Sequence, residues 1–114
     1  MKIVSDKISI DELKDIAEQT FGELVKATVD VAREIMVVGG ELHSDEEALL
    51  LSNGSKQKDI WEINLYPEKY PESSWIEFDS IINLRPSFGN KSGSIEDPNI
   101  RGEIIEIVNK LVVE

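Results

Sequence analysis

The chain has 114 residues, which fits one domain over residues 1–114, and its 40% hydrophobic content is ordinary for a globular protein. It has no cysteine, which excludes disulfides, thiolate metal sites and a cysteine nucleophile. The net charge of −11 disfavours nucleic-acid binding, because such a chain repels phosphates. No apolar run is long enough for a membrane span or a signal peptide, so we expect a cytoplasmic protein with no membrane partner.

The first part of the chain alternates between strand and helix patterns. The predicted elements are strands over 2–5, 24–31 and 34–42 and a helix over 10–21. Ser9 and Glu12 have the spacing of a capping box, which favours a helix start at this point. The strand over 24–31 alternates apolar and polar residues, whereas the strand over 34–42 is more apolar and therefore more central. Gly39 and Gly40 near its end predict a bulge or a close backbone approach.

The remaining elements follow the same logic. We expect a short helix from Ser44 to the Asn53-Gly54 pair, strands over 60–66 and 75–84, and a last helix from Pro98 onward. Ser44 and Glu47 form a second capping-box pattern, and Asp97 is a typical N-cap before a proline. Ile81-Ile82 breaks the alternation of the strand over 75–84, which predicts a bulge near Ser80.

The predicted order is therefore β-α-β-β-α-β-β-α. Adjacent strands with short connections favour antiparallel pairing. We expect an α+β fold with an antiparallel or mixed sheet of about four to five strands and three helices that cover one face of the sheet.

Two long motifs of this chain together resemble a known protein family. GGELHSDEEALLL (39–51) and FDSIINLRPSFGN (78–90) resemble a family of small prokaryotic proteins catalogued as a domain of unknown function. The likeness covers nearly the whole chain. It implies a one-domain cytoplasmic protein without an assigned activity, and it contributes no catalytic residue.

The first candidate site surrounds His43, the only histidine of the chain. Glu41, Asp45, Glu46 and Glu47 lie next to it in sequence, and a histidine with carboxylates can bind a metal or transfer a proton. We take His43, Glu41, Asp45 and Glu47 as the candidate catalytic residues. The spacing matches no helical metal motif, and the alternative is that His43 packs locally while the acids stabilise the start of a helix.

The second candidate site is an anion site in the loop that precedes the last helix. Residues 80–95 contain no acid in a chain with 23 acidic residues. A helix N-terminus follows, and its free amides favour anions such as phosphate or carboxylate. The candidate ligand-binding residues are Asn83, Arg85, Ser87, Asn90, Lys91 and Ser92. Asp97 would compete for the same amides, no phosphate-loop motif is present, and the alternative is an ordinary exposed loop.

Two further features carry weaker hypotheses. Residues 48–58 are also free of acids and contain Lys56 and Lys58, so a local positive site would form if this segment met the 86–96 loop. Among the aromatic residues, we expect Trp61 and Phe78 in the core and Tyr66 and Tyr70 nearer the surface.

The function that we expect is binding, with no chemistry of its own. The partner is either another protein, including a second copy in a homodimer, or a small anion at the 85–94 loop. The main alternative is a metal-assisted hydrolase that uses His43 with nearby carboxylates. Cation binding by the acidic surface is a third hypothesis, although the spaced pattern of a calcium loop is missing. No motif identifies an enzyme class or a cofactor.

Overall fold

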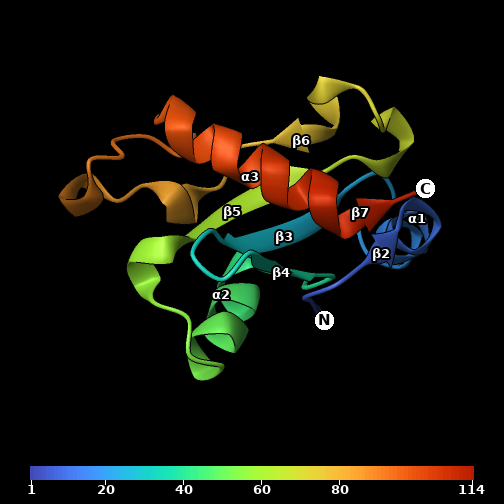
Figure 1. Cartoon of the computed structure of the whole chain (residues 1–114), viewed down its shortest axis with the longest axis horizontal. Helices are drawn as coiled ribbons and strands as arrows, with labels where there is room; N and C mark the ends of the chain where they lie inside the picture. The colour runs from blue at the N-terminus through green and yellow to red at the C-terminus, as the bar shows by residue number, and fades with distance from the viewer.

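A computed structural model describes residues 1–114 and contains a five-stranded antiparallel sheet, three α-helices and a small two-stranded parallel sheet (Figure 1). The main sheet has the order β1-β4-β3-β5-β6, with β1 Lys2–Val4, β4 Ile35–Val38, β3 Val25–Asp30, β5 Ile60–Leu65 and β6 Ile76–Glu77. The helices are α1 Ile10–Gln19, α2 His43–Ser52 and α3 Pro98–Leu111. The α+β class and the predicted order are confirmed, and β2 Ile8–Ser9 and β7 Val112–Val113 are additional short strands.

The two faces of the sheet differ because side chains alternate along each strand. Val25, Ala27 and Val29 of β3 point into the main core, which α1 and α3 cover. Thr28 on the same strand points the other way and hydrogen-bonds to Glu46 of α2. The expectation that helices cover one face is therefore wrong, and the molecule has three layers with α2 alone on the second face.

The helix starts confirm two of the three predicted caps. The Ser9 hydroxyl accepts a hydrogen bond from the amide of Glu12 at 3.0 Å, and the Asp97 carboxylate accepts one from the amide of Asn99 at 2.8 Å. The predicted cap at Ser44 is wrong, because α2 begins one residue earlier, at His43. Its N-cap is Leu42, whose side chain cannot accept a hydrogen bond.

The predicted strand over 75–84 is wrong beyond Glu77, where β6 ends, and residues 81–83 form a short 3-10 helix. The edge of β5 is completed by a side chain instead of a strand. Asn83 Oδ1 accepts the amide of Glu62 at 3.0 Å, and Asn83 Nδ2 donates to the carbonyl of Glu62 at 2.9 Å. A carboxamide carries the same donor and acceptor as a peptide group, so it can replace one residue of a neighbouring strand.

Gly40 confirms the predicted close approach. An added Cβ at this position would lie 2.7 Å from Cγ of Glu46, and the Gly40 amide donates to Glu46 Oε2 at 2.9 Å.

No helix of the protein combines the length and apolar character that a membrane span requires.

Gly40→Ala should lower the free energy of unfolding by about 1–3 kcal/mol, the usual cost of overpacking, because Glu46 would have to move. Chemical denaturation measures the change. Gly102→Ala is the matched control, since its Cβ meets no atom within 4 Å and the change should stabilise α3 by about 0.5–1 kcal/mol. Unchanged stability of Gly40→Ala would show that α2 has room to shift.

Asn83→Ala should lower the free energy of unfolding by about 2–4 kcal/mol, because it leaves the buried backbone amide and carbonyl of Glu62 without hydrogen-bond partners. Asn99→Ala, at an exposed position, should stay within about 0.5 kcal/mol of the wild type in the same denaturation experiment. Equal losses for the two variants would mean that the Asn83 side chain does not hold the sheet edge.

Candidate functional site

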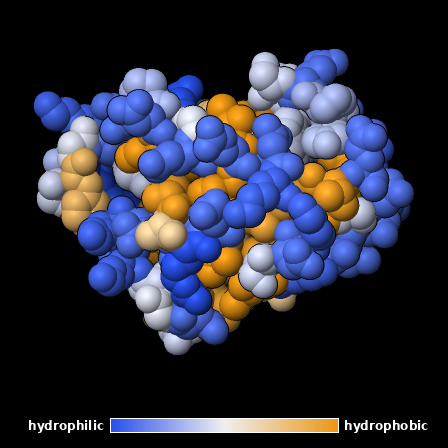
Figure 2. Space-filling view, viewed as in Figure 1, coloured by the Kyte–Doolittle hydropathy of each residue, from blue (hydrophilic) through white to orange (hydrophobic).

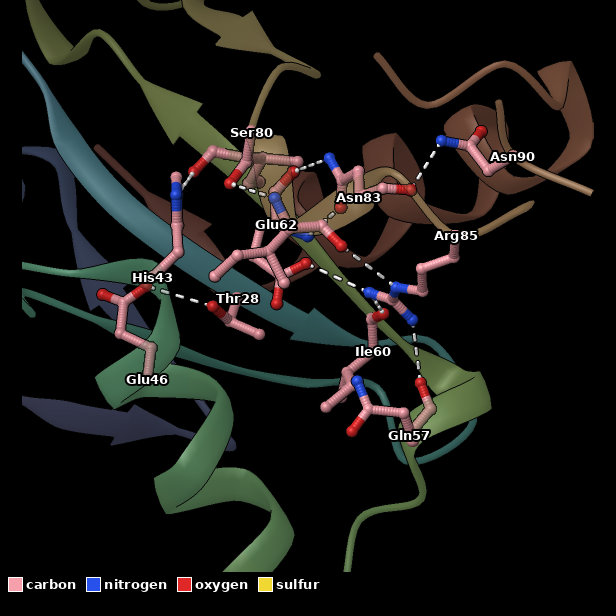
Figure 3. Close-up of polar contacts among 12 residues, drawn as sticks. Thr28, His43, Glu46, Gln57, Ile60, Glu62, Ser80, Asn83, Arg85 and Asn90 are labelled. Carbon is pink, nitrogen blue, oxygen red and sulfur yellow. Dashed lines mark hydrogen bonds and ion pairs between the residues drawn. The ribbon is translucent and has the colours of Figure 1, made fainter. Parts of the chain in front are cut away.

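Helix α2 meets the sheet through a buried carboxyl group (Figure 3). Glu46 is fully buried, its Oε1 accepts the hydroxyl of Thr28 at 3.1 Å, and its Oε2 accepts the amide of Gly40 at 2.9 Å. Burial raises the pKa of Glu46 to about 8, although these two hydrogen bonds act in the opposite direction. Glu46 is therefore mostly protonated at neutral pH and fixes the first turn of α2 to β3.

A second buried glutamate lies beside the first. Glu62 is fully buried and accepts Arg85 Nη2 at 3.1 Å. Its Oε1 and the Oε2 of Glu47 are buried and have no donor, so a hydrogen bond between the two carboxyl groups needs one shared proton. The pKa of Glu62 is raised to about 8, mainly by burial and also by the hydrogen bond with Glu47, while Arg85 acts in the opposite direction.

The structure gives Arg85 a role inside the fold. Its Nη1 donates to the carbonyl of Gln57 at 2.9 Å, its Nη2 donates to the carbonyl of Ile60 at 2.6 Å, and its guanidinium lies 4.7 Å from the ring centre of Trp61. Residues 48–58 thus contact Arg85, which precedes the 86–96 loop, through the carbonyl of Gln57, and this contact brings neither Lys56 nor Lys58 to the loop. An anion at Arg85 would have to displace these contacts.

The six predicted ligand-binding residues do not gather around one cavity. Asn83, Arg85 and Asn90 are buried and bonded to the chain, and Ser87, Lys91 and Ser92 are exposed. The Asn90 amide donates to the carbonyls of Asn83, Ser92 and Ser94 at 2.7–3.0 Å, which shapes the loop itself. The three buried residues of the predicted anion site therefore use their side chains to hold the fold.

His43 is the first residue of α2 and only 7% exposed. Its Nε2 lies 2.8 Å from the carbonyl oxygen of Ile63, and because a carbonyl only accepts, Nε2 carries the proton. Burial lowers the pKa of His43, and the nearby positive charge of Lys26 lowers it as well, while the hydrogen bond to Ile63 acts to raise it. The ring is neutral at pH 7, so Nδ1 is an acceptor, and it has no hydrogen-bond partner in the chain.

The carboxylates predicted to act with His43 do not join it. Glu41 and Asp45 are exposed, and Glu47 faces Glu62. No three His, Asp or Glu side chains of the protein lie in a geometry that could hold a metal ion. Of the four candidate catalytic residues, only His43 reaches the cavity described next.

The largest cavity is a cleft of about 640 Å³ at the start of α2, between β3 and residues 79–82. Its apolar lining consists of Phe21, Leu24, Leu42, Ile81 and Ile82. Its polar lining consists of Lys26, His43, Ser44, Asn64, Asp79 and Ser80. Sequence reasoning found His43 but missed the others, because their convergence depends on the early end of β6.

The opposite face of the molecule offers much less space. Figure 2 shows this face, where orange apolar atoms emerge between hydrophilic residues. The groove lined by Trp75, Ile76 and Ile105 of α3 holds only about 180 Å³. The cleft at the start of α2 is therefore the better candidate for a binding site.

Stability should fall as the pH rises from about 5 to 8, because the unfolded chain ionises its glutamates near pH 4.5 whereas folded Glu46 and Glu62 keep their protons up to about pH 8. Each group contributes a slope of up to about 1.4 kcal/mol per pH unit. Glu46→Gln removes one titrating group and should flatten the slope by roughly half in denaturation series at several pH values.

Glu103→Gln, an exposed position on α3, is the control and should leave the slope unchanged. A Glu46→Gln protein with the wild-type slope would show that Glu46 is already ionised in the folded state at neutral pH.

The sequence model described as "Protein of unknown function (DUF5674)" matches residues 2–111. No curated protein and no solved structure matches the chain. The resemblance to a domain of unknown function is confirmed over nearly the whole length. The chain thus belongs to the DUF5674 family of proteins of unknown function.

Proposed function

We propose that this protein binds a small organic molecule in the cleft at the start of α2. The observation that carries the proposal is the convergence of exposed apolar side chains from three separate segments. Phe21, Leu42 and Ile81 are 45%, 55% and 77% exposed, and all three line the same cleft. Exposed apolar side chains that gather around a concave surface are typical of ligand sites, and the cleft volume lies within their usual range of about 300–1,000 Å³.

The polar groups of the cleft support a preformed site. The carbonyl of Ile63 holds the His43 ring in one orientation, and the helical turn that carries His43 is fixed to the sheet by the buried Glu46, which binds Thr28 and Gly40. A ligand would therefore meet groups that lose little freedom when it binds, which favours affinity.

A second candidate is an enzyme that uses His43 as a general base. The neutral ring with a free Nδ1 beside a cleft supports it, since a base must be unprotonated and within reach of its substrate. This version of the hydrolase hypothesis uses His43 without Glu41 or Asp45, which lie outside the cleft.

Both candidates can be tested by titrating a library of small apolar molecules, with acidic, basic and neutral members, into ¹⁵N-labelled protein. Amide shifts should concentrate at cleft residues, with dissociation constants on the order of 0.1–1 mM for fragments of this size. Leu42→Ser should weaken binding severalfold. Leu51→Ser, at the exposed far end of α2, is the matched control and should not.

Three outcomes separate the hypotheses. A hit that binds and stays chemically unchanged supports a binding function. If the wild-type protein converts a hit to a product and His43→Gln does not, the result favours catalysis. Shifts confined to the α3 groove, or line broadening at the cleft that grows with protein concentration, would contradict a small-molecule site. The latter would place a second copy of the chain at the cleft.

A further inference from the structure

Lys26 supplies the only cationic side chain of the cleft. It is half-buried, its ammonium lies 4.8 Å from the ring centre of Phe21, and none of the four ion pairs of the protein includes it. The other lysines are either exposed or paired. In a chain with a net charge of −11, a half-buried ammonium without a carboxylate partner is a natural place for an anionic ligand group.

The start of α2 adds donors beside this charge. Leu42 provides no side-chain cap, and the amides of His43 and Ser44 have no acceptor in the chain. These amides and the positive end of the helix favour a carboxylate. Of the two acids in the first turn of α2, Glu46 directs its carboxyl into the sheet, where Thr28 and Gly40 bind it, and Asp45 is exposed and lies outside the cleft.

His43 favours a hydrogen-bond donor on the ligand, whereas Lys26 and the α2 amides favour an acceptor. The ring is more than nine-tenths buried, lines the cleft, and leaves Nδ1 as an acceptor without a partner. A ligand that satisfies this atom must donate a hydrogen bond, as a hydroxyl or an amino group does.

Asp79 limits the charge of the ligand. It lies on the rim of the cleft, is exposed, and makes no ion pair. A second negative charge on the ligand would meet this carboxylate and be repelled, which disfavours phosphate esters and dicarboxylates.

From these four features we infer that the cleft selects a small monocarboxylate that has an apolar body and a hydrogen-bond donor next to its carboxylate. The carboxylate lies at Lys26 and the start of α2, the donor faces His43 Nδ1, and the apolar body contacts Phe21, Leu42 and Ile81. This inference rests on the proposed function and specifies the ligand of that same cleft.

A matched set of four probes tests each feature by chemical-shift titration. They are 3-phenyllactate, which has all three features, 3-phenylpropionate, which lacks the hydroxyl, 3-phenylpropanol, which lacks the carboxylate, and phenyl phosphate, which is a dianion. We expect 3-phenyllactate to bind tightest. Lys26→Met should weaken the binding of the two carboxylates by about 10- to 100-fold, the usual contribution of a charged hydrogen bond, and leave the binding of 3-phenylpropanol unchanged.

Three further variants isolate the roles of Lys26 and His43. Lys26→Arg should retain carboxylate binding, and Lys56→Met, at an exposed position outside the cleft, should have no effect. His43→Phe removes the Nδ1 acceptor and, unlike a glutamine, introduces no new one; it keeps a flat ring at this position at the cost of the donor to the carbonyl of Ile63. It should therefore abolish the preference for 3-phenyllactate over 3-phenylpropionate while the effect of Lys26→Met persists.

The inference is overturned if 3-phenylpropanol binds as tightly as the carboxylates, if Lys26→Met leaves their affinity unchanged, or if phenyl phosphate binds tightest. In each of these cases the cleft still binds ligands and the proposed function stands. The inference also fails if none of the probes shifts the cleft amides while other library members do. If no library member shifts them, the proposed function itself fails. If Lys26→Met does not fold, the ranking of the four probes on the wild-type protein still tests whether the cleft prefers a monocarboxylate with a hydrogen-bond donor.

Discussion

The central constraint on this fold is that the second face of its sheet carries polar side chains that are fully buried, beside a small apolar cluster of Ile35, Val37, Leu50 and Ile60. Thr28 of β3 and Glu62 of β5 pair across the two strands, and both are fully buried under α2. Buried polar groups are stable only when they are hydrogen-bonded, so whatever covers this face must supply partners. Helix α2 supplies Glu46 and Glu47, and the segment after β6 supplies Asn83 and Arg85.

This requirement explains the position of the candidate site. The carboxyl groups that attach α2 to the sheet lie in its first two turns, so the start of the helix is held in a fixed place. His43 is carried by the same turn and points toward β5, where it reaches the carbonyl of Ile63. The cleft thus has one wall that is anchored by buried hydrogen bonds and one wall, residues 79–82, that belongs to a loop.

Much of the fold follows from local patterns that act over a few residues. The alternation of Val25, Ala27 and Val29, the Ser9 cap and the Asp97 cap each depend on neighbours in sequence, and each was predicted. In the sequence, the polar positions of β3 and β5, such as Thr28 and Glu62, have the pattern of a solvent-facing side. Periodicity, however, distinguishes two faces of a strand without saying whether the polar one is covered.

The site was less accessible to sequence reasoning, and the reason is physical. Arg85, Asn83 and Asn90 have the composition of an anion-binding loop, but their donors are taken by backbone carbonyls. Those bound by Arg85 and Asn83, such as Gln57 and Glu62, lie far away in sequence, and those bound by Asn90 lie within the loop itself. Likewise, the acids around His43 follow each other in sequence but diverge in space, because α2 begins at His43 and turns Glu46 inward and Asp45 outward. Ser44 resembled a cap because a capping box and a first helical turn share the same residue types.

The Asn83 carboxamide has one further consequence. A complete edge strand alongside Ile60–Glu62 would run extended to residue 81 and beyond, parallel to the sheet plane. Because the side chains of Asn83 and Arg85 satisfy that edge, the backbone from Asp79 to Ile82 is released from strand geometry and lines a cleft with the beginning of α2. The asparagine that closes β5 to further strands therefore also leaves Ile81 free to line the same cleft as the only histidine of the chain.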